Sequence, residues 1–270
     1  MPKVSIISGA YNVAGVFSFH KSMQSILTQS FVDFEYIICD DGSTDATWEF
    51  LCDYASKDSR IKLIQNEKNM GLAYSLNKCL ELASGEYIAR HDLDDYSDKE
   101  RLQKQVLFLD SNKNIALLGT QAYLFDKNGV WGKEHFPLSV TKRDFLFTSP
   151  YQHGAMMIRR DALAHIGGYR VAKETRRAED YDLFMTMHTM YNGANLEECL
   201  YYFCEDDSSK KRRKYRYRID EMKVRYRGFK KLGLLPRGIF YVIKPLFVGL
   251  IPARLLDKLK RKRARREEIR

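Results

Sequence analysis

Residues 85–98 read GEYIARHDLDDYSD. Tyr87–Ala89 predict a short buried strand, and Asp92, Asp94 and Asp95 follow it closely. Like charges at this spacing repel one another unless a cation lies among them. A hard divalent ion with oxygen ligands, which keeps open positions for substrate phosphates, fits this pattern. The alternative is an acidic, solvated loop that precedes a helix.

Three more apolar runs precede this stretch and predict strands at Val4–Ile7, Phe34–Cys39 and Ile61–Ile64. The four runs recur about every 30 residues with helical apolar spacing between them, which is the pattern of βαβ units. Such units form a parallel sheet with right-handed crossovers. We therefore expect an α/β fold with a mostly parallel central sheet flanked by helices.

Polar loops follow all four predicted strands, at Tyr11–Asn12, Asp40–Asp41, Asn69–Gly71 and Asp92–Asp95. The carboxyl ends of parallel strands lie at one edge of the sheet, and ligands bind there in α/β proteins. Neither GxGxxG nor GxxxxGK(S/T) occurs in these loops. A typical dinucleotide or P-loop site is therefore not predicted.

The charge of the chain is divided unevenly along its 270 residues. Residues 210–270 hold 23 Lys and Arg against 5 Asp and Glu, a net +18, whereas residues 1–209 hold 22 against 30, a net −8. The basic tail indicates an anionic partner, either a membrane surface or a nucleic acid. Five cysteines without metal-binding spacing, and no secretory leader before the first strand, predict a cytoplasmic protein.

Five segments carry a resemblance to a known family: VSIISGAYN, QSILTQSFVDFEYIICDDGSTD, NMGLAYSLNKCLELASGEYIARHDLDD, HGAMMIRRDALAHIGGY and AEDYDLFMTM. The chain resembles the family 2 glycosyltransferases, inverting enzymes of GT-A fold that use nucleotide-diphosphate sugars. The resemblance implies a Rossmann-like catalytic domain over residues 1–205 and a basic helical tail over residues 206–270. The QxxRW motif of processive synthases is absent, which implies addition of a single sugar, as in bacterial surface-polysaccharide enzymes.

The resemblance also assigns roles to the polar loops. Asp41, the second acid of the DDGS block, would accept the imide N–H of a pyrimidine base, while Asp40 anchors the turn. UDP is the expected nucleotide, with dTDP and GDP as alternatives. Nucleotide-sugar binding is implied for Gly9, Ala10, Tyr11, Asp41, Asn69, Gly71, Asp92 and Glu179.

The implied cofactor is Mn²⁺ or Mg²⁺. Asp94 would be a direct ligand, and Asp92 would lie near the metal or the ribose. The ion would bridge the two phosphates and stabilise the departing nucleoside diphosphate. Asp95 and His153 are candidates for supporting the metal ligands; the alternatives are a turn cap for Asp95 and a core histidine for His153.

Glu179–Asp180 open a segment with apolar residues on one helical face. Acidic residues are common at helix N-termini because the macrodipole favours them. The resemblance instead makes Asp180 the general base that takes the proton from the acceptor hydroxyl. An inverting reaction needs one such carboxylate opposite the leaving group.

The tail combines two cation clusters, Lys210–Arg218 and Lys258–Arg266, with an amphipathic helix over Ile219–Leu232 and an apolar stretch over Gly238–Leu256. Because Lys244 and proline interrupt this stretch, we expect it to lie in the plane of a membrane surface rather than to span the bilayer. Residues 210–270 would thus attach the protein to the anionic inner face of the plasma membrane. The alternative is a helix packed on the catalytic domain.

Two other classes compete with the transferase. A nucleotidyltransferase that makes the activated sugar would need a basic, Gly-rich loop after the first strand, and SGAYNVAG lacks the cations. A nucleic-acid-binding protein could use the basic tail, although the apolar middle of the tail disfavours it, and no nucleic acid is expected as a partner. The expected acceptor is a lipid-linked glycan.

Overall fold

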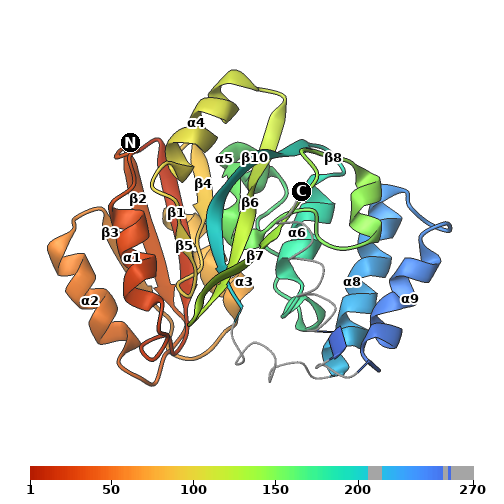
Figure 1. The fold of residues 1–270 in the computed structure, drawn as a ribbon, viewed down its shortest axis with the longest axis horizontal. Coiled ribbons are helices and arrows are strands. Elements are labelled where there is room, and N and C mark those ends of the chain that lie inside the picture. Colours follow the sequence, from red (N-terminus) through yellow and green to blue (C-terminus); the bar gives the residue numbers. More distant parts are fainter. Residues whose placement is uncertain (206–214, 252–254, 257–270) are drawn as a thin grey trace.

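The computed structural model describes residues 1–205, 215–251 and 255–256 (Figure 1). Its central sheet begins with four parallel strands in the order β3 (Ile61–Gln65), β2 (Phe34–Asp40), β1 (Val4–Ala10) and β4 (Tyr87–Arg90). These are the four strands expected from the apolar runs. The predicted α/β class and the mostly parallel sheet are confirmed.

The second half of the sheet mixes parallel and antiparallel strands. β9 (Met157–Arg159) lies antiparallel between β4 and β6 (Ile115–Asp126), and β10 (Asn192–Cys204) continues parallel to β6. Three further strands pair antiparallel at this end: β5 (Tyr96–Ser97) and β8 (Ser139–Val140) with β10, and β7 (Gly129–Glu134) with β6.

Helices cover both faces of the sheet (Figure 1). They are α1 (Phe19–Leu27), α2 (Thr47–Lys57), α3 (Leu72–Leu82), α4 (Arg101–Ser111), α5 (Arg160–His165) and α6 (Glu179–Met187), with 3-10 helices η1 (Lys142–Leu146), η2 (His153–Ala155) and η3 (Lys173–Thr175). Alternate residues of one strand point to opposite faces. Ile6 accordingly belongs to the core under α1 and α4, and Ile7 to the core under α3 and α6. Burial on both faces explains why the strands appear as continuous apolar runs.

The turn after β2 requires a glycine. Gly42 has φ +69°, and a Cβ at this position would lie 2.6 Å from the backbone of Lys68. The buried Asp40 carboxylate accepts hydrogen bonds from the Ser43 backbone at 3.2 Å and from the Gln65 amide at 3.0 Å. Asp40 therefore anchors the turn, as expected.

The helices of the tail pack on the catalytic part of the chain. Val224, Phe229 and Leu232 of α8 (Arg216–Leu232) are buried in the same core as the residues of α6. Gly228 allows this approach, because a Cβ there would collide with the sulfur of Met185. The boundary expected after residue 205 stays a prediction, but the buried residues of α8 share a core with those of α6.

α9 (Ile239–Val248) follows α8 and contains Pro245. Within the described ranges, no helix has both the length and the apolar character needed to cross a bilayer. Of the expected cation clusters, residues 210–214 and 258–266 lie outside the described residues. The membrane-surface role of the tail remains a prediction.

Candidate active site

Asp41 joins the loops that follow β2 and β3. Its buried carboxylate accepts hydrogen bonds from the backbone N–H groups of Met70 and Gly71, both at 2.8 Å, and from the Asn66 amide at 2.9 Å. Gly71 needs its φ of +97° to start α3 here. Asp41 thus holds in place the loop of Asn69 and Gly71, two of the predicted donor-binding residues.

The end of β1 lies beside this loop. The Asp41 backbone N–H donates to the Ala10 carbonyl at 2.7 Å, and Tyr11 is 47% exposed. A Cβ on Gly9 would lie 2.7 Å from Leu72 of α3. The structure therefore brings the predicted donor residues of the first three loops to one edge of the sheet, and their contact with a nucleotide stays a prediction.

The acidic loop after β4 alternates between partly exposed and buried side chains. Asp92 and Asp94 are partly exposed, whereas Asp95 is buried. One Asp95 oxygen accepts a hydrogen bond from the Cys204 backbone at 2.7 Å. Burial, then the charges of Asp94 and Asp92, raise the pKa of Asp95 well above its usual range. Asp95 thus ties the loop to β10.

The donor set suits a metal ion that shares its coordination with a substrate. Across the described ranges, no three His, Cys, Asp or Glu side chains form a ready metal cage. Mg²⁺ is usually held by one or two carboxylates together with substrate phosphates rather than by an all-protein cage. Asp92 and Asp94 fit that requirement, since both are carboxylates within reach of solvent.

Two buried arginines support this loop, and the sequence reasoning missed both. Arg90 at the end of β4 forms an ion pair with Asp92 and donates to the His91 carbonyl. Arg101 of α4 donates to the carbonyls of Arg90 at 3.1 Å and of Gly154 at 3.2 Å. Arginine is almost never fully buried unless paired. The position of Arg90 directly after the apolar run Tyr87–Ala89 was therefore the sequence signal for a buried ion pair.

Glu179 and Asp180 form the first turn of α6, near the acidic loop. Burial, then the charge of Asp180, raise the pKa of Glu179 to about 8. Burial raises the pKa of Asp180 to about 6, and the charges of Asp92 and Glu221 contribute. The structure thus places Asp180 close enough to Asp92 for their charges to interact. A carboxylate with a pKa near neutrality can accept a proton from a hydroxyl group.

Two histidines, His153 and His91, come close to the acidic loop in space or in sequence, and both have hydrogen-bond partners within the protein. The His153 Nε2 lies 2.9 Å from the Tyr169 hydroxyl, and burial lowers the pKa of His153 well below its usual range. The next residue, Gly154, packs on the acidic loop: a Cβ there would lie 2.9 Å from an Asp92 carboxylate oxygen. His91 is fully buried, with its Nε2 2.8 Å from the Ser22 hydroxyl. His153 therefore lies beside the acidic loop, and His91 lies in the core.

Two arginines of the segment between α5 and α6, Arg170 and Arg176, were candidates for approaching the donor loop. A Cβ on Gly71 would lie 3.9 Å from Nε of Arg176, so this arginine lies beside the predicted donor loop. Arg170, by contrast, is paired with Asp182 at 3.0 Å and with Glu174 at 2.6 Å. Of the two, Arg176 is the one that lies beside the donor loop.

Comparison with known proteins identifies the family. Residues 5–167 match the model of the family described as "Glycosyl transferase family 2". The Bacillus subtilis (strain 168) protein named "Putative glycosyltransferase EpsE" is 40% identical over 264 residues, which is 97% of this chain and 94% of that protein. The Escherichia coli "UDP-Glc:alpha-D-GlcNAc-diphosphoundecaprenol beta-1,3-glucosyltransferase WfaP" is 40% identical over 113 residues, 42% of this chain and 43% of that protein.

A solved structure shows the same fold. The structure of S. aureus TarS 1–349 in complex with UDP-GlcNAc superposes with a TM-score of 0.68 at 22% identity, over 88% of this chain and 72% of that one. The relatives also decide between the two enzyme classes that the sequence left open, because they are named transferases of sugars rather than nucleotidyltransferases. This chain belongs to glycosyl transferase family 2 and is a glycosyltransferase of GT-A fold.

Proposed function

We propose that this protein transfers one sugar from a UDP-sugar to a hydroxyl group of a lipid-linked glycan, with inversion at the anomeric carbon. The observation that carries the proposal is the position of Asp180, whose pKa is raised to about 6 beside the acidic loop. In this reaction the acceptor oxygen attacks the anomeric carbon as the bond to UDP breaks, and the hydroxyl proton passes to Asp180. No covalent sugar–enzyme intermediate is needed.

The acidic loop supplies the other half of the chemistry. Asp94 and Asp92 would hold Mn²⁺ or Mg²⁺, and a bound ion neutralises the negative charge that develops on the departing diphosphate. Arg90 keeps the Asp92 carboxylate oriented through their ion pair. Glu179, with a pKa of about 8, stays protonated at neutral pH. It therefore adds no second negative charge beside the base.

The nucleotide and the acceptor are supported by the relatives. UDP-GlcNAc is bound in the TarS structure, and the name of WfaP specifies a UDP-sugar donor and a diphosphoundecaprenol acceptor. Calorimetry with UDP, with and without Mn²⁺, tests the donor half. We expect Mn²⁺ to tighten UDP binding in the wild type, and the absence of UDP binding under both conditions would contradict the proposal.

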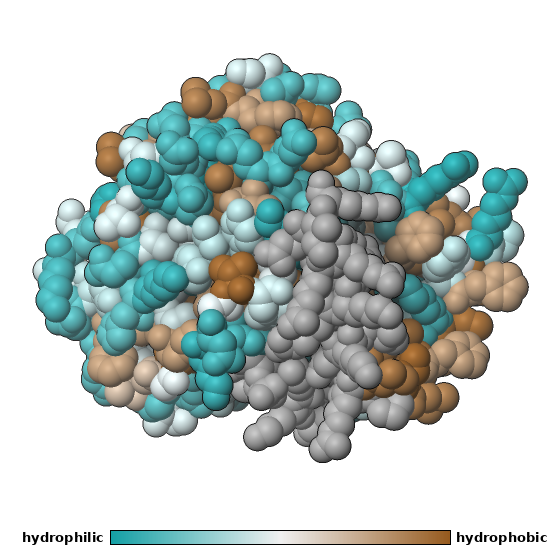
Figure 2. Space-filling model, viewed as in Figure 1, coloured by the Kyte–Doolittle hydropathy of each residue, from teal (hydrophilic) through white to brown (hydrophobic). Residues whose placement is uncertain are grey.

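A lipid-linked acceptor requires a protein at the membrane surface, and α9 offers an apolar contact. Phe240 and Phe247 are 76% and 63% exposed, and Leu250 after the helix is 71% exposed. Figure 2 shows apolar side chains at the edge of the molecule where α9 lies. Lys244 of the same helix does not oppose contact between these apolar side chains and a membrane, because its ammonium group donates to the Phe147 carbonyl at 3.3 Å. We propose peripheral attachment to the inner face of the plasma membrane through α9.

Vesicle sedimentation tests the attachment. The double variant Phe240→Ser/Phe247→Ser should lose binding to anionic vesicles at moderate salt and keep its melting temperature, because both side chains are exposed. A matched control removes two exposed apolar side chains elsewhere, Val32→Ser and Leu138→Ser, which are 70% and 51% exposed. Equal vesicle binding by the two double variants would contradict attachment through α9.

A further inference from the structure

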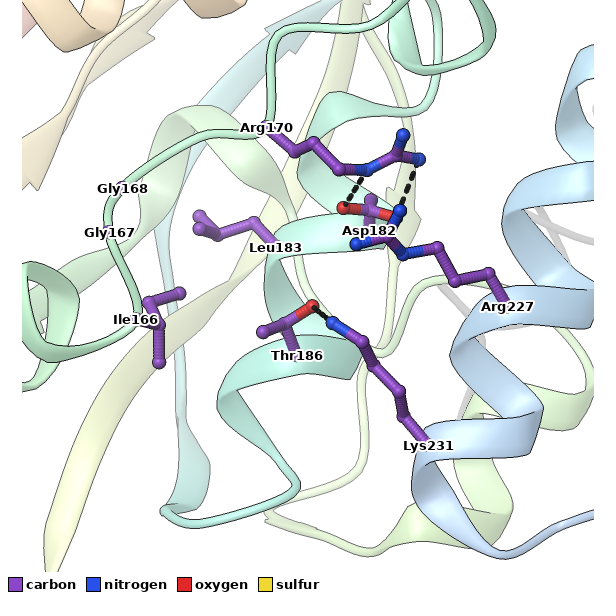
Figure 3. Close-up of a pocket in the computed structure, with 9 residues that line it drawn as sticks. All are labelled: Ile166, Gly167, Gly168, Arg170, Asp182, Leu183, Thr186, Arg227 and Lys231. Atoms are coloured by element: carbon purple, nitrogen blue, oxygen red, sulfur yellow. Dashed lines mark hydrogen bonds and ion pairs between the residues drawn. The ribbon is translucent and has the colours of Figure 1, made fainter.

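A pocket of about 250 Å³ lies between the turn after α5, the helix α6 and the helix α8 (Figure 3). It is lined by Ile166, Gly167, Gly168, Arg170, Asp182, Leu183, Thr186, Arg227 and Lys231. Asp182 and Asp180 are two residues apart on α6, so they point about 200° away from each other around the helix axis. The pocket therefore opens on the face of α6 opposite the proposed base.

The charges that line the pocket do not cancel. Asp182 is occupied by Arg170, whose Nε and terminal nitrogen donate to the two carboxylate oxygens at 3.0 and 3.1 Å. Arg170 also pairs with Glu174 at 2.6 Å, outside the pocket lining. Arg227 and Lys231 are exposed side chains that project into the pocket from consecutive turns of α8 (Figure 3). The Lys231 ammonium group donates to the neutral Thr186 hydroxyl at 3.2 Å. Among the described residues, no carboxylate forms an ion pair with either cation.

Two like charges one turn apart destabilise a helix unless a counter-charge lies near. Burial, and then the charge of Arg227, lower the pKa of Lys231, and the charge of Asp182 opposes them. The volume is smaller than the ~300–1,000 Å³ of pockets for drug-sized ligands. A compact anion with two negative charges matches both the space and the two cations.

We propose that this pocket binds a phosphate group through Arg227 and Lys231. Arginine and lysine are the side chains that recognise phosphate oxygens, the first through its planar fork and the second as a point charge. The phosphate belongs either to a lipid headgroup or to a soluble phosphorylated compound. The site is separate from the donor site and does not rest on the proposed sugar transfer.

The test follows the Gly167 and Gly168 amides by NMR during titration of the full-length protein with inorganic phosphate in metal-free buffer. We expect saturable shifts of both signals in the wild type and much weaker shifts with acetate, which carries a single charge. Arg227→Gln/Lys231→Gln should weaken phosphate binding by at least about tenfold. The control Lys223→Gln/Lys230→Gln removes the same charge from positions of α8 that are equally exposed but lie outside the pocket. It should change the affinity less than about twofold.

Equal weakening in both double variants, or acetate binding as tight as phosphate binding, would overturn the proposal. The melting temperature of each variant checks folding, and Lys231→Arg, which keeps the charge, should retain phosphate binding even if the double variant does not fold. Sedimentation with phosphatidylglycerol-containing vesicles then identifies the source. Loss of vesicle binding in the pocket variant but not in the control assigns a lipid headgroup, whereas retention in both assigns a soluble phosphate compound.

Discussion

Replacing Asp180 by asparagine should remove activity and increase stability at the same time. Without a general base, transfer should fall by roughly two to four orders of magnitude, while UDP binding should be kept because the proposed base contacts the acceptor rather than the nucleotide. Burial raises the pKa of Asp180 from 3.8 to about 6, and one pKa unit corresponds to about 1.4 kcal/mol. Ionised Asp180 therefore destabilises the folded protein by up to about 3 kcal/mol at neutral pH, an upper limit because Asp180 is not fully shielded from solvent.

The pH dependence gives the sign of the effect. The folded protein binds the Asp180 proton more tightly than the unfolded chain, so the wild type loses stability as the pH rises from about 4 to about 6. Asparagine stays neutral. The gain in the free energy of unfolding should be absent near pH 4, about half developed near pH 5 and complete above pH 6. Measurements up to pH 7 keep Glu179 protonated, since its pKa is about 8.

Urea denaturation at pH 5 and pH 7, together with turnover of a UDP-sugar, checks both effects. Asp182→Asn is the contrast on the same helix: it breaks the bidentate pair with Arg170 and should cost about 2–4 kcal/mol at both pH values. Wild-type turnover in Asp180→Asn would refute the assignment of the base. A loss of stability like that of Asp182→Asn would instead show that Asp180 is structural.

Three further changes test the other elements of the site and fold. Asp94→Asn should abolish the effect of Mn²⁺ on UDP binding measured by calorimetry, and an unchanged effect would remove Asp94 from the ligand set. Gly42→Ala should destabilise the protein by about 1–3 kcal/mol, because its φ is +69° and the Lys68 backbone lies 2.6 Å from the added carbon; an unaltered urea midpoint would contradict this. Phe229→Ala should cost about 3–5 kcal/mol, and a smaller effect than at exposed Tyr226→Ala would show that α8 is no part of the core.

The half of the fold that carries the donor loops was predictable because its signals are local. Strands such as Val4–Ala10 are buried on both faces, which produces uninterrupted apolar runs in the sequence. The loops at their carboxyl ends then share an edge by topology alone. The same reasoning brought Asp41 and Asn69 together, and Asp41 indeed holds the Asn69 loop through the neighbouring Met70 and Gly71.

The remaining features depend on distant contacts. The reversal at β9 pairs Ala89 with Met157, and nothing near either residue indicates that partner. Arg101 is buried because the Gly154 carbonyl reaches it from η2. In the tail, the spacing of Val224 and Leu232 indicated an apolar face but not what covers it. Charge composition therefore suggested a separate tail, whereas α8 shares a buried core with α6.

The most direct test of the account is the anomer that the enzyme releases. Incubation with α-configured UDP-sugars and Mn²⁺, with water as the slow acceptor, should release UDP and the free sugar, and early NMR spectra distinguish its anomers before they equilibrate. Attack from the face opposite UDP, with Asp180 as the base, predicts that the β-anomer appears first and that Asp180→Asn abolishes its formation. An α-anomer appearing first, or β-anomer formed at the wild-type rate by Asp180→Asn, would contradict it.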